Sequence, residues 1–348
     1  MSTDCACSNW TMVGHPKSAY WPDDHPKWHH PDCEHYIKPG GTMTHKARIL
    51  ADSISPQGHR LTTLEVTFPR IVLAEFNTHR VFSRNSASSR AIPVEKMLRM
   101  VQDNPYIPTH WGKNQKGMQA EEELSAHDQD VAREEWLWAR ERAALQAQKL
   151  LDLGVHKQIT NRLLEPFMWH TVIVTATEWN NWDHLRANPK AHPEIKLAAE
   201  LMLEASVSST PKQLGYTDWH MPLIFEEDWD AVISLNPTNP RAVQAMLVKI
   251  SVGRCARVSY LTHDGKRDLQ ADIELAERLL EAGHMSPFEH VARPMSMDEL
   301  EIFKQPVVEW RDGVAWPTGK HTHFCGNFDG WIQYRKTIPN EHDILGKP

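Results

Sequence analysis

The sequence predicts an α+β fold in which helices pack on a small antiparallel sheet. Segments 47–55 and 60–68 carry strand-like patterns, and the turn sequence SPQGH joins them, which is typical of a β-hairpin. Segment 170–177 is rich in β-branched residues and predicts a further strand. Apolar residues at helical spacing elsewhere predict that helices dominate. With 348 residues and 41% hydrophobic content, the chain can bury one large core or two modest ones.

Each remaining element follows from its local pattern. Pro69 is expected to open a helix that continues to residue 82, because proline suits the first helical turn. Residues 131–153 carry an apolar stripe at helical spacing and end at Gly154, a typical helix stop. We expect further helices at 156–164, 191–205, 241–251 and 268–284.

The chain divides into four parts by composition. Residues 1–44 lack periodicity and predict a flexible extension; Cys5, Cys7, Cys33 and His35 within it could bind zinc, and a disordered tail is the alternative. Residues 45–206 form the expected catalytic core, 207–240 a connection, and 241–348 a segment that completes the core.

Bulk properties exclude several classes of protein. A net charge of −7 argues against a general nucleic-acid coat, although a local basic pocket can still bind a small anion. No run of apolar residues is long enough to span a membrane, and the N-terminus lacks the apolar stretch of a secretory signal. Five cysteines do not make a disulfide framework in a chain this long, so we expect a cytoplasmic protein.

The densest polar motif is THRVFSRNSASSR at 78–90. Arg80 and Arg90 can each bind a phosphate through a planar guanidinium, and the serines add hydroxyl donors. His79 can stack on a planar ring. A solvated loop that caps a helix is the alternative. No Walker A loop, dinucleotide fingerprint or serine-hydrolase elbow is present, and HMSPFEH at 284–290 does not match zinc-protease spacing, so no metal site is expected.

This motif resembles the signature RHRxxSxNExSxR of flavin-dependent thymidylate synthases. Six positions match, namely His79, Arg80, Ser83, Asn85, Ser88 and Arg90. GVHKQITNRLLEP and WNNWDHLRANPKAHPEIKLAA resemble two further family segments. CARVSY and HMSPFEH resemble pieces that open the family's sequences but come last here. The resemblance therefore implies the thymidylate synthase-like fold in a permuted order, with helices supplied by the C-terminal segment.

The resemblance also implies an activity: reduced FAD, regenerated by NADPH, and methylenetetrahydrofolate convert dUMP to dTMP. It implies a homotetramer with active sites between subunits. The implied cofactor contacts are His79, Arg80, Ser83, Asn85, Asn181 and His290. The implied nucleotide contacts are Ser86, Ser88, Arg90 and Arg186. Arg90, Asn161 and Arg186 are the implied catalytic residues.

Departures from the family pattern occur at positions that the resemblance places near the substrate. Thr78 replaces an arginine, Ser86 replaces a glutamate, and Asn161 stands where an arginine would contact the pyrimidine. Gln333 and Arg335 could replace the lost donors. Because an amide offers either a donor or an acceptor, a dCMP methylase or hydroxymethylase is an alternative. A relative that only binds nucleotide or flavin is a third possibility.

Overall fold

The computed structural model describes residues 44–258, 268–304, 308–311, 314–317, 327–339 and 341. The zinc ligands considered above, Cys5, Cys7, Cys33 and His35, lie outside these residues, as does nearly all of the extension 1–44. Within the described ranges, none of the helices has the length and apolar character needed to cross a membrane.

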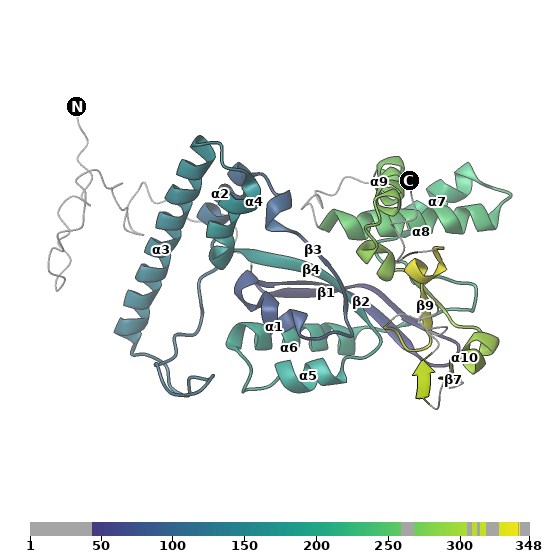
Figure 1. Ribbon diagram of the computed structural model, residues 1–348, viewed down its shortest axis with the longest axis horizontal. Coiled ribbons are helices and arrows are strands. Elements are labelled where there is room, and N and C mark those ends of the chain that lie inside the picture. The colour runs from purple at the N-terminus through teal and green to yellow at the C-terminus, as the bar shows by residue number, and fades with distance from the viewer. Residues whose placement is uncertain are drawn as a thin grey trace.

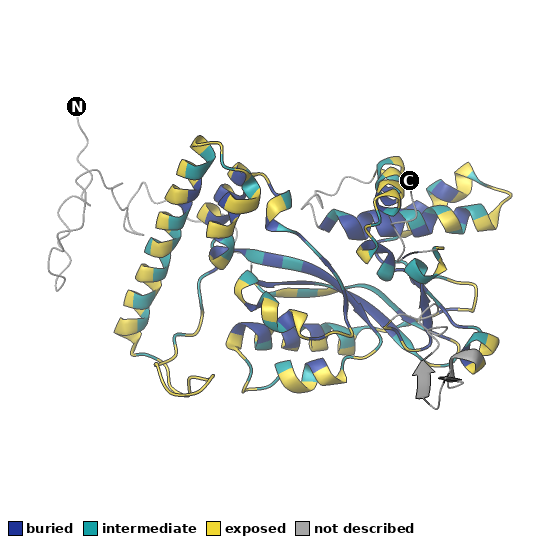
Figure 2. Ribbon diagram, in the orientation of Figure 1, coloured by how far each residue is buried: buried dark blue, intermediate teal, exposed yellow. Residues whose placement is uncertain are grey.

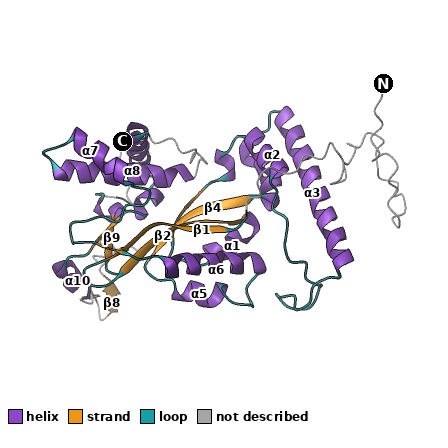
Figure 3. Cartoon of the chain, turned by 180° about the vertical axis from the view of Figure 1, so that it is seen from behind, coloured by secondary structure: helices purple, strands orange, loops and turns teal. Residues whose placement is uncertain are grey.

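A five-stranded sheet forms the centre of the molecule (Figure 3). Its strands lie in the order β3 (Ser83–Ser86), β4 (Trp169–Ala176), β2 (Arg60–Pro69), β1 (Lys46–Ile54) and β5 (Lys212–Gln213). Only the short β1–β5 pair is parallel; the other neighbours are antiparallel. The predicted α+β class, the hairpin and the strand near 170–177 are confirmed.

One face of the sheet packs against α5 (Asn180–Arg186) and α6 (Pro193–Ser208), which lie below it in Figure 1. The short helix α1 (Leu73–Asn77) adds Phe76 to the same core. Alternate strand residues point into this core because side chains of a strand alternate between its two faces. The buried residues include Leu64, Val66, Phe68, Val172, Val174, Trp182, Ile195, Ala198 and Met202.

A helical layer covers one end of the sheet. It contains α2 (Val94–Asp103), α3 (Ala126–Asp152), α4 (Lys157–Thr160) and the 3-10 helix η4 (Asn161–Phe167). The predicted helix at 131–153 is confirmed and begins earlier, because the Ser125 hydroxyl accepts the backbone N–H of Asp128 and caps the first turn. The helix predicted at 156–164 is α-helical for one turn only and continues as η4, which contains Pro166.

The C-terminal segment packs on the other face of the sheet. It contains α8 (Pro240–Arg257), α9 (Leu269–Glu281), η6 (Ser286–Glu289), β6 (Ala292–Pro294), α10 (Met297–Lys304), β7 (Val308–Arg311), β8 (Val314–Pro317), β9 (Trp331–Gln333) and η8 (Tyr334–Thr337), and α7 (Glu226–Leu235) of the connection packs against α8. Helix α8 is the most buried of its helices (Figure 2). It meets α9 closely at Gly253, where a Cβ would lie 2.2 Å from the carbonyl oxygen of Asp272. Cys255 and Val258 reach the sheet residue Ile173.

Three local details differ from what the sequence predicted. The helix that follows Pro69 is a 3-10 turn, η2 (Arg70–Val72), and then α1, which ends at Asn77 rather than residue 82. The polar residues 83–86, expected in a loop, form the edge strand β3. Residues 207–240, expected as a connection, also contain helix α7. The permuted order of the motifs stays a prediction.

Candidate functional site

Strand β3 places the middle of the 78–90 motif between the sheet and the C-terminal segment. Ser83 and Asn85 pair with Thr175 and Ile173 of β4 and therefore share the face that the C-terminal segment covers. The Gln333 amide donates to the Ser83 hydroxyl at 3.0 Å. The Asn85 amide donates to the carbonyl oxygen of Cys255 at 2.7 Å. Three predicted site residues are thus brought together, but their polar groups connect segments of the fold.

His79 precedes β3 and contacts helix α5 rather than the C-terminal segment. Its ring is 6% exposed and lies at the edge of Trp182, with centroids 4.8 Å apart. The Arg186 Nε donates to its Nε2 at 3.0 Å, and Nη2 of the same guanidinium donates to the Thr78 hydroxyl at 3.0 Å. Burial, with the charges of Arg186 and Arg84, lowers the pKa of His79 to about 4. The ring is therefore neutral near pH 7, and its proton lies on Nδ1 because Nε2 accepts.

The end of the motif forms the 3-10 turn η3 (Ser89–Ala91), and the side chain of Asn161 binds the backbone of this turn. Asn161 is fully buried, and its amide nitrogen donates to the carbonyl oxygens of Ser89 at 2.7 Å and Ile92 at 2.8 Å. In the single chain its side chain is therefore not open to a pyrimidine. Ser88 is half-buried and Arg90 is exposed.

His290, at the end of η6, belongs to a buried chain of side chains that we call the histidine chain. Its Nδ1 lies 2.8 Å from the Thr175 hydroxyl, which lies 2.7 Å from the Thr63 hydroxyl. Thr63 in turn lies 2.7 Å from Nε2 of His220, whose Nδ1 lies 2.8 Å from the Ser53 hydroxyl. Burial lowers the pKa of both histidines to about 3, so both rings are neutral at pH 7. Nε2 of His290 is buried and has no hydrogen-bond partner within the described residues.

The other predicted site residues differ in their exposure and in whether they already form ion pairs. Arg335 forms ion pairs with Glu289 and Glu341, so its guanidinium is already neutralised in the single chain. Asn181 and Arg80 are exposed. Ser86 lies on the edge strand and is half-buried.

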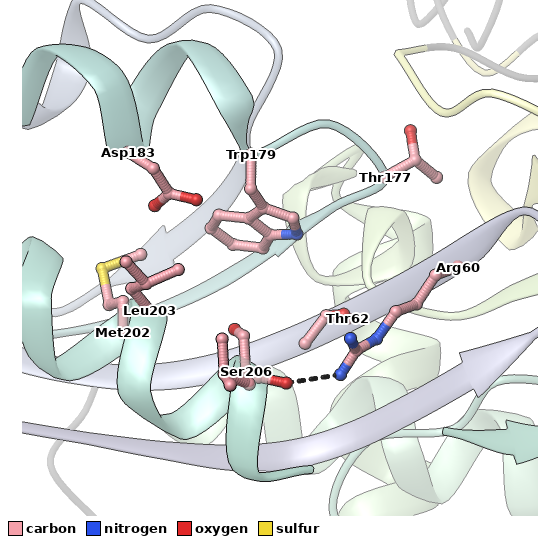
Figure 4. Close-up of a pocket in the computed structure, with 9 residues that line it drawn as sticks. Arg60, Thr62, Thr177, Trp179, Asp183, Met202, Leu203 and Ser206 are labelled. Carbon is pink, nitrogen blue, oxygen red and sulfur yellow. Dashed lines mark hydrogen bonds between the residues drawn. The ribbon is translucent and has the colours of Figure 1, made fainter. Parts of the chain in front are cut away.

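Two cavities lie away from these residues. One, of about 190 Å³, opens beside α5 and α6 (Figure 4) and is lined by Arg60, Thr62, Thr177, Trp179, Asp183, Met202, Leu203, Ser206 and Val207. A second, of about 410 Å³, is lined by Lys96, Arg99, Met100, Val101, Asp103, Asn104, Met168 and Trp169. Neither contains a predicted site residue. Of the predicted residues, Ser83, Asn85 and Ser86 lie in the edge strand β3, and His79, Arg80, Ser88 and Arg90 flank it in the sequence.

The donors along the β3 edge fit a ligand rich in acceptors, such as a flavin or a nucleotide phosphate. Arg80 and Arg90 are exposed guanidiniums. Nη1 of Arg84 is buried with no partner within the described residues, as is Nε2 of His290. Buried polar groups are normally paired, so such atoms indicate a missing partner. The residues present therefore fit the cofactor that the resemblance implies.

Sequence reasoning missed His220, Thr63 and Thr175. His220 stands alone in TDWHMP, outside any motif, and the two threonines follow ordinary strand patterns. Only the pairing of β2 with β4 brings the threonines face to face, so no local signal could have identified them.

Comparison with known proteins identifies the family. The family model of thymidylate synthase complementing proteins matches residues 36–212, about half of the chain. A solved structure of the UMP/dUMP methylase PolB from Streptomyces cacaoi bound with 5-Br UMP is 19% identical, with 47% of this chain and 89% of that chain covered and a TM-score of 0.39. PolB bound with 5-Br dUMP is 22% identical, covering 43% and 67%, with a TM-score of 0.35. No curated protein matches the sequence. On the strength of the family model, the chain belongs to the thymidylate synthase complementing proteins.

Proposed function

We propose that the chain is a flavin-dependent methyltransferase that acts on C5 of a pyrimidine deoxynucleotide, converting dUMP to dTMP. The family match carries the proposal, because it covers the whole 78–90 motif. The arrangement supports it, since His79 and the two exposed arginines flank the edge strand β3, and His290, whose Nε2 is unpaired within the described residues, binds Thr175 of the neighbouring strand β4.

FAD is the proposed cofactor, with NADPH as its reductant and methylenetetrahydrofolate as the carbon donor. When bound, the reduced flavin supplies the hydride that the reaction needs. Arg80, Asn181, the Nδ1–H of His79 and Nε2 of His290 are the groups proposed to hold it. Ser83 and Asn85 would act indirectly, because their polar atoms bind Gln333 and Cys255.

The proposed nucleotide contacts are Ser88, Arg90 and Arg186. Arg90 is exposed and offers a planar fork that matches a phosphate. Nη1 of Arg186 forms no hydrogen bond within the described residues, so it remains available while Nε holds His79. Gln333 and Arg335 stay predicted contacts; to use them, a nucleotide would have to compete with Ser83 and Glu289.

A homo-oligomer is also proposed. Three apolar side chains are exposed in this region: Leu153, at the end of α3, by 78%, and Ile159 and Leu163, in α4 and η4 beside the η3 turn, by 57% and 40%. Covering such residues is a usual result of subunit association. Light scattering coupled to size-exclusion chromatography tests this, and a monomer at micromolar concentration would contradict it.

Turnover with two nucleotides in parallel tests the activity. Reduced protein with FAD is incubated with dUMP or dCMP and labelled methylenetetrahydrofolate, and we expect label in the dUMP product. Arg90→Ala should abolish this transfer, whereas Arg133→Ala, which removes an exposed arginine of α3, should not. Label in dCMP alone would support the alternative substrate. A colourless protein that binds no FAD would support an inactive relative.

A further inference from the structure

Arg84 is a half-buried arginine in the middle of the edge strand β3. It pairs with Val174 of β4, and Ser86 pairs with Val172. Both valines belong to the core between the sheet and the helices α5 and α6, so the side chains of Arg84 and Ser86 leave β3 on that face. Arg84 therefore points away from the C-terminal segment, on the side where Arg186 of α5 binds His79.

The guanidinium of Arg84 is not satisfied by the fold. Its Nη1 is buried, yet it has no hydrogen-bond partner in the part of the chain that the structure describes. An arginine keeps its charge near pH 7, so the group cannot avoid this cost by losing a proton. A buried donor on a charged group is costly when it is left unpaired. The ligand-free protein therefore holds a cation in β3 that a bound anion would stabilise.

The charged neighbours of Arg84 do not supply that anion. Burial and the charge of Arg80 lower the pKa of Arg84, and Glu289 opposes them only in part. Glu289 lies in η6 and already forms an ion pair with Arg335. The carboxylate that acts on Arg84 is therefore shared with a second, closer arginine, and positive charge remains at this edge of the sheet.

We propose that Arg84 is a further binding residue, which holds a phosphate group of the ligand at the edge of the sheet. Its planar guanidinium can meet two phosphate oxygens at once, and the hydroxyl of Ser86 on the same face adds a donor. Position 84 is one of the unspecified positions of RHRxxSxNExSxR, so the resemblance gives Arg84 no role. The source of the phosphate, a nucleotide monophosphate or the diphosphate of FAD, rests on the proposed function, whereas the phosphate contact does not.

Two methionine variants separate a binding role of Arg84 from a structural one. Arg84→Met removes the charge and keeps an unbranched side chain. Arg48→Met is the matched control, because Arg48 is also a strand arginine but already forms an ion pair with Glu65. In a buffer free of phosphate and sulfate, the Arg84→Met protein should melt at the temperature of the unmodified protein or above it, since an unpaired charge has been removed. A lower melting temperature than that of Arg48→Met would make Arg84 a folding residue and overturn the proposal.

Pyrophosphate tests the contact without flavin or nucleotide. Isothermal titration calorimetry of the full chain should show that pyrophosphate binds the unmodified protein. Binding should be at least tenfold weaker in Arg84→Met, because a charge-assisted pair is lost, and should change less than twofold in Arg48→Met. Equal affinities of the unmodified and Arg84→Met proteins, or no binding of pyrophosphate at millimolar concentration, would overturn the proposal.

Ligand pairs with and without phosphate identify the source: dUMP against deoxyuridine, and FAD against riboflavin. Arg84→Met should weaken the phosphate-bearing member of one pair at least tenfold and change its phosphate-free member less than twofold. An equal loss for both members would place Arg84 against a ring and overturn the proposal. If pyrophosphate binding responds to Arg84→Met but neither dUMP nor FAD binds, the proposed function fails and the phosphate contact stands. If methyl transfer to dUMP occurs and no phosphate-bearing ligand responds to Arg84→Met, the contact fails and the proposed function stands.

Discussion

Strand β3 and the η3 turn, adjacent parts of one motif, are held in the fold by different means. β3 pairs with β4 through its backbone, and its side chains join it to the C-terminal segment, since Ser83 and Asn85 bind Gln333 and Cys255. The turn is held through its backbone, because the Asn161 amide binds two carbonyl oxygens there. The difference leaves Ser88 and Arg90 of the turn available for a ligand.

Residues that complete the fold therefore differ from residues that can bind a ligand. A buried polar group already paired within the chain can contribute to a site only by holding other groups in place. An exposed guanidinium contributes little to folding and is free to meet a phosphate. The following changes should therefore have very different effects on stability.

Asn161→Leu should have the largest effect. The substitution keeps the branched shape but leaves the buried carbonyl oxygen of Ile92 without its side-chain donor and that of Ser89 with only the backbone N–H of Ile92. We expect a loss of about 3 kcal/mol in the free energy of unfolding, measured by urea denaturation. Asn181→Leu, at an exposed position, is the control and should change little. Similar losses in both variants would contradict the supporting role of Asn161.

Asn85→Ala should have a smaller but clear effect. It removes the 2.7 Å bond to Cys255 and leaves that helix carbonyl without its side-chain donor. We expect a loss of about 2 kcal/mol. Ser286→Ala, which removes only the 3.3 Å bond from Ser286 to Asn85, should cost less than half as much. The same urea experiment measures both, and an equal cost would show that the bond to Cys255 is not the stronger of the two side-chain contacts of Asn85.

Acidification should lower the free energy of unfolding through His79, which precedes β3. The pKa of His79 is about 4 in the folded protein, below the ordinary histidine value of 6.5. Between these two values the unfolded chain binds more protons, so stability that is present above pH 6.5 is lost as pH falls toward 4. Thermal melts at pH 7, 6 and 5 should show a steeper decline for the unmodified protein than for His79→Gln. Carboxylates titrate in both proteins, so parallel declines would rule out a contribution from His79.

Arg90→Ala should have the smallest effect on stability, within about 0.5 kcal/mol, because the side chain is exposed. Binding of a pyrimidine nucleotide should nevertheless weaken at least tenfold by calorimetry, since the proposed phosphate contact is lost. A large loss of stability would place Arg90 with the residues that complete the fold, and unchanged binding would remove it from the proposed site.

The parts of the fold that could be predicted are those whose local sequence determines their structure. The hairpin and strand β4 follow from alternation and β-branched residues, and α3, α6, α8 and α9 follow from apolar spacing and caps. β3 could not be predicted, because SRNS has no apolar residue and becomes a strand only by pairing with β4. The motifs at 78–90 and 284–290 identified His79 and His290, but the burial of Asn161 and the partners of His290 depend on contacts between distant segments.

Those distant contacts have a consequence for how the protein is made. The sheet and the two helices beneath it are complete once the chain has been synthesised to residue 213, but Ser83 reaches Gln333 across 250 residues and Asn85 reaches Cys255 across 170. Contacts of such long range form late, because the intervening chain must first be brought together. A newly made chain therefore passes through a stage in which the sheet exists while the face bearing Ile173 and Thr175 is still uncovered. At that stage the protein is most susceptible to aggregation and to proteases, until the C-terminal segment covers this face.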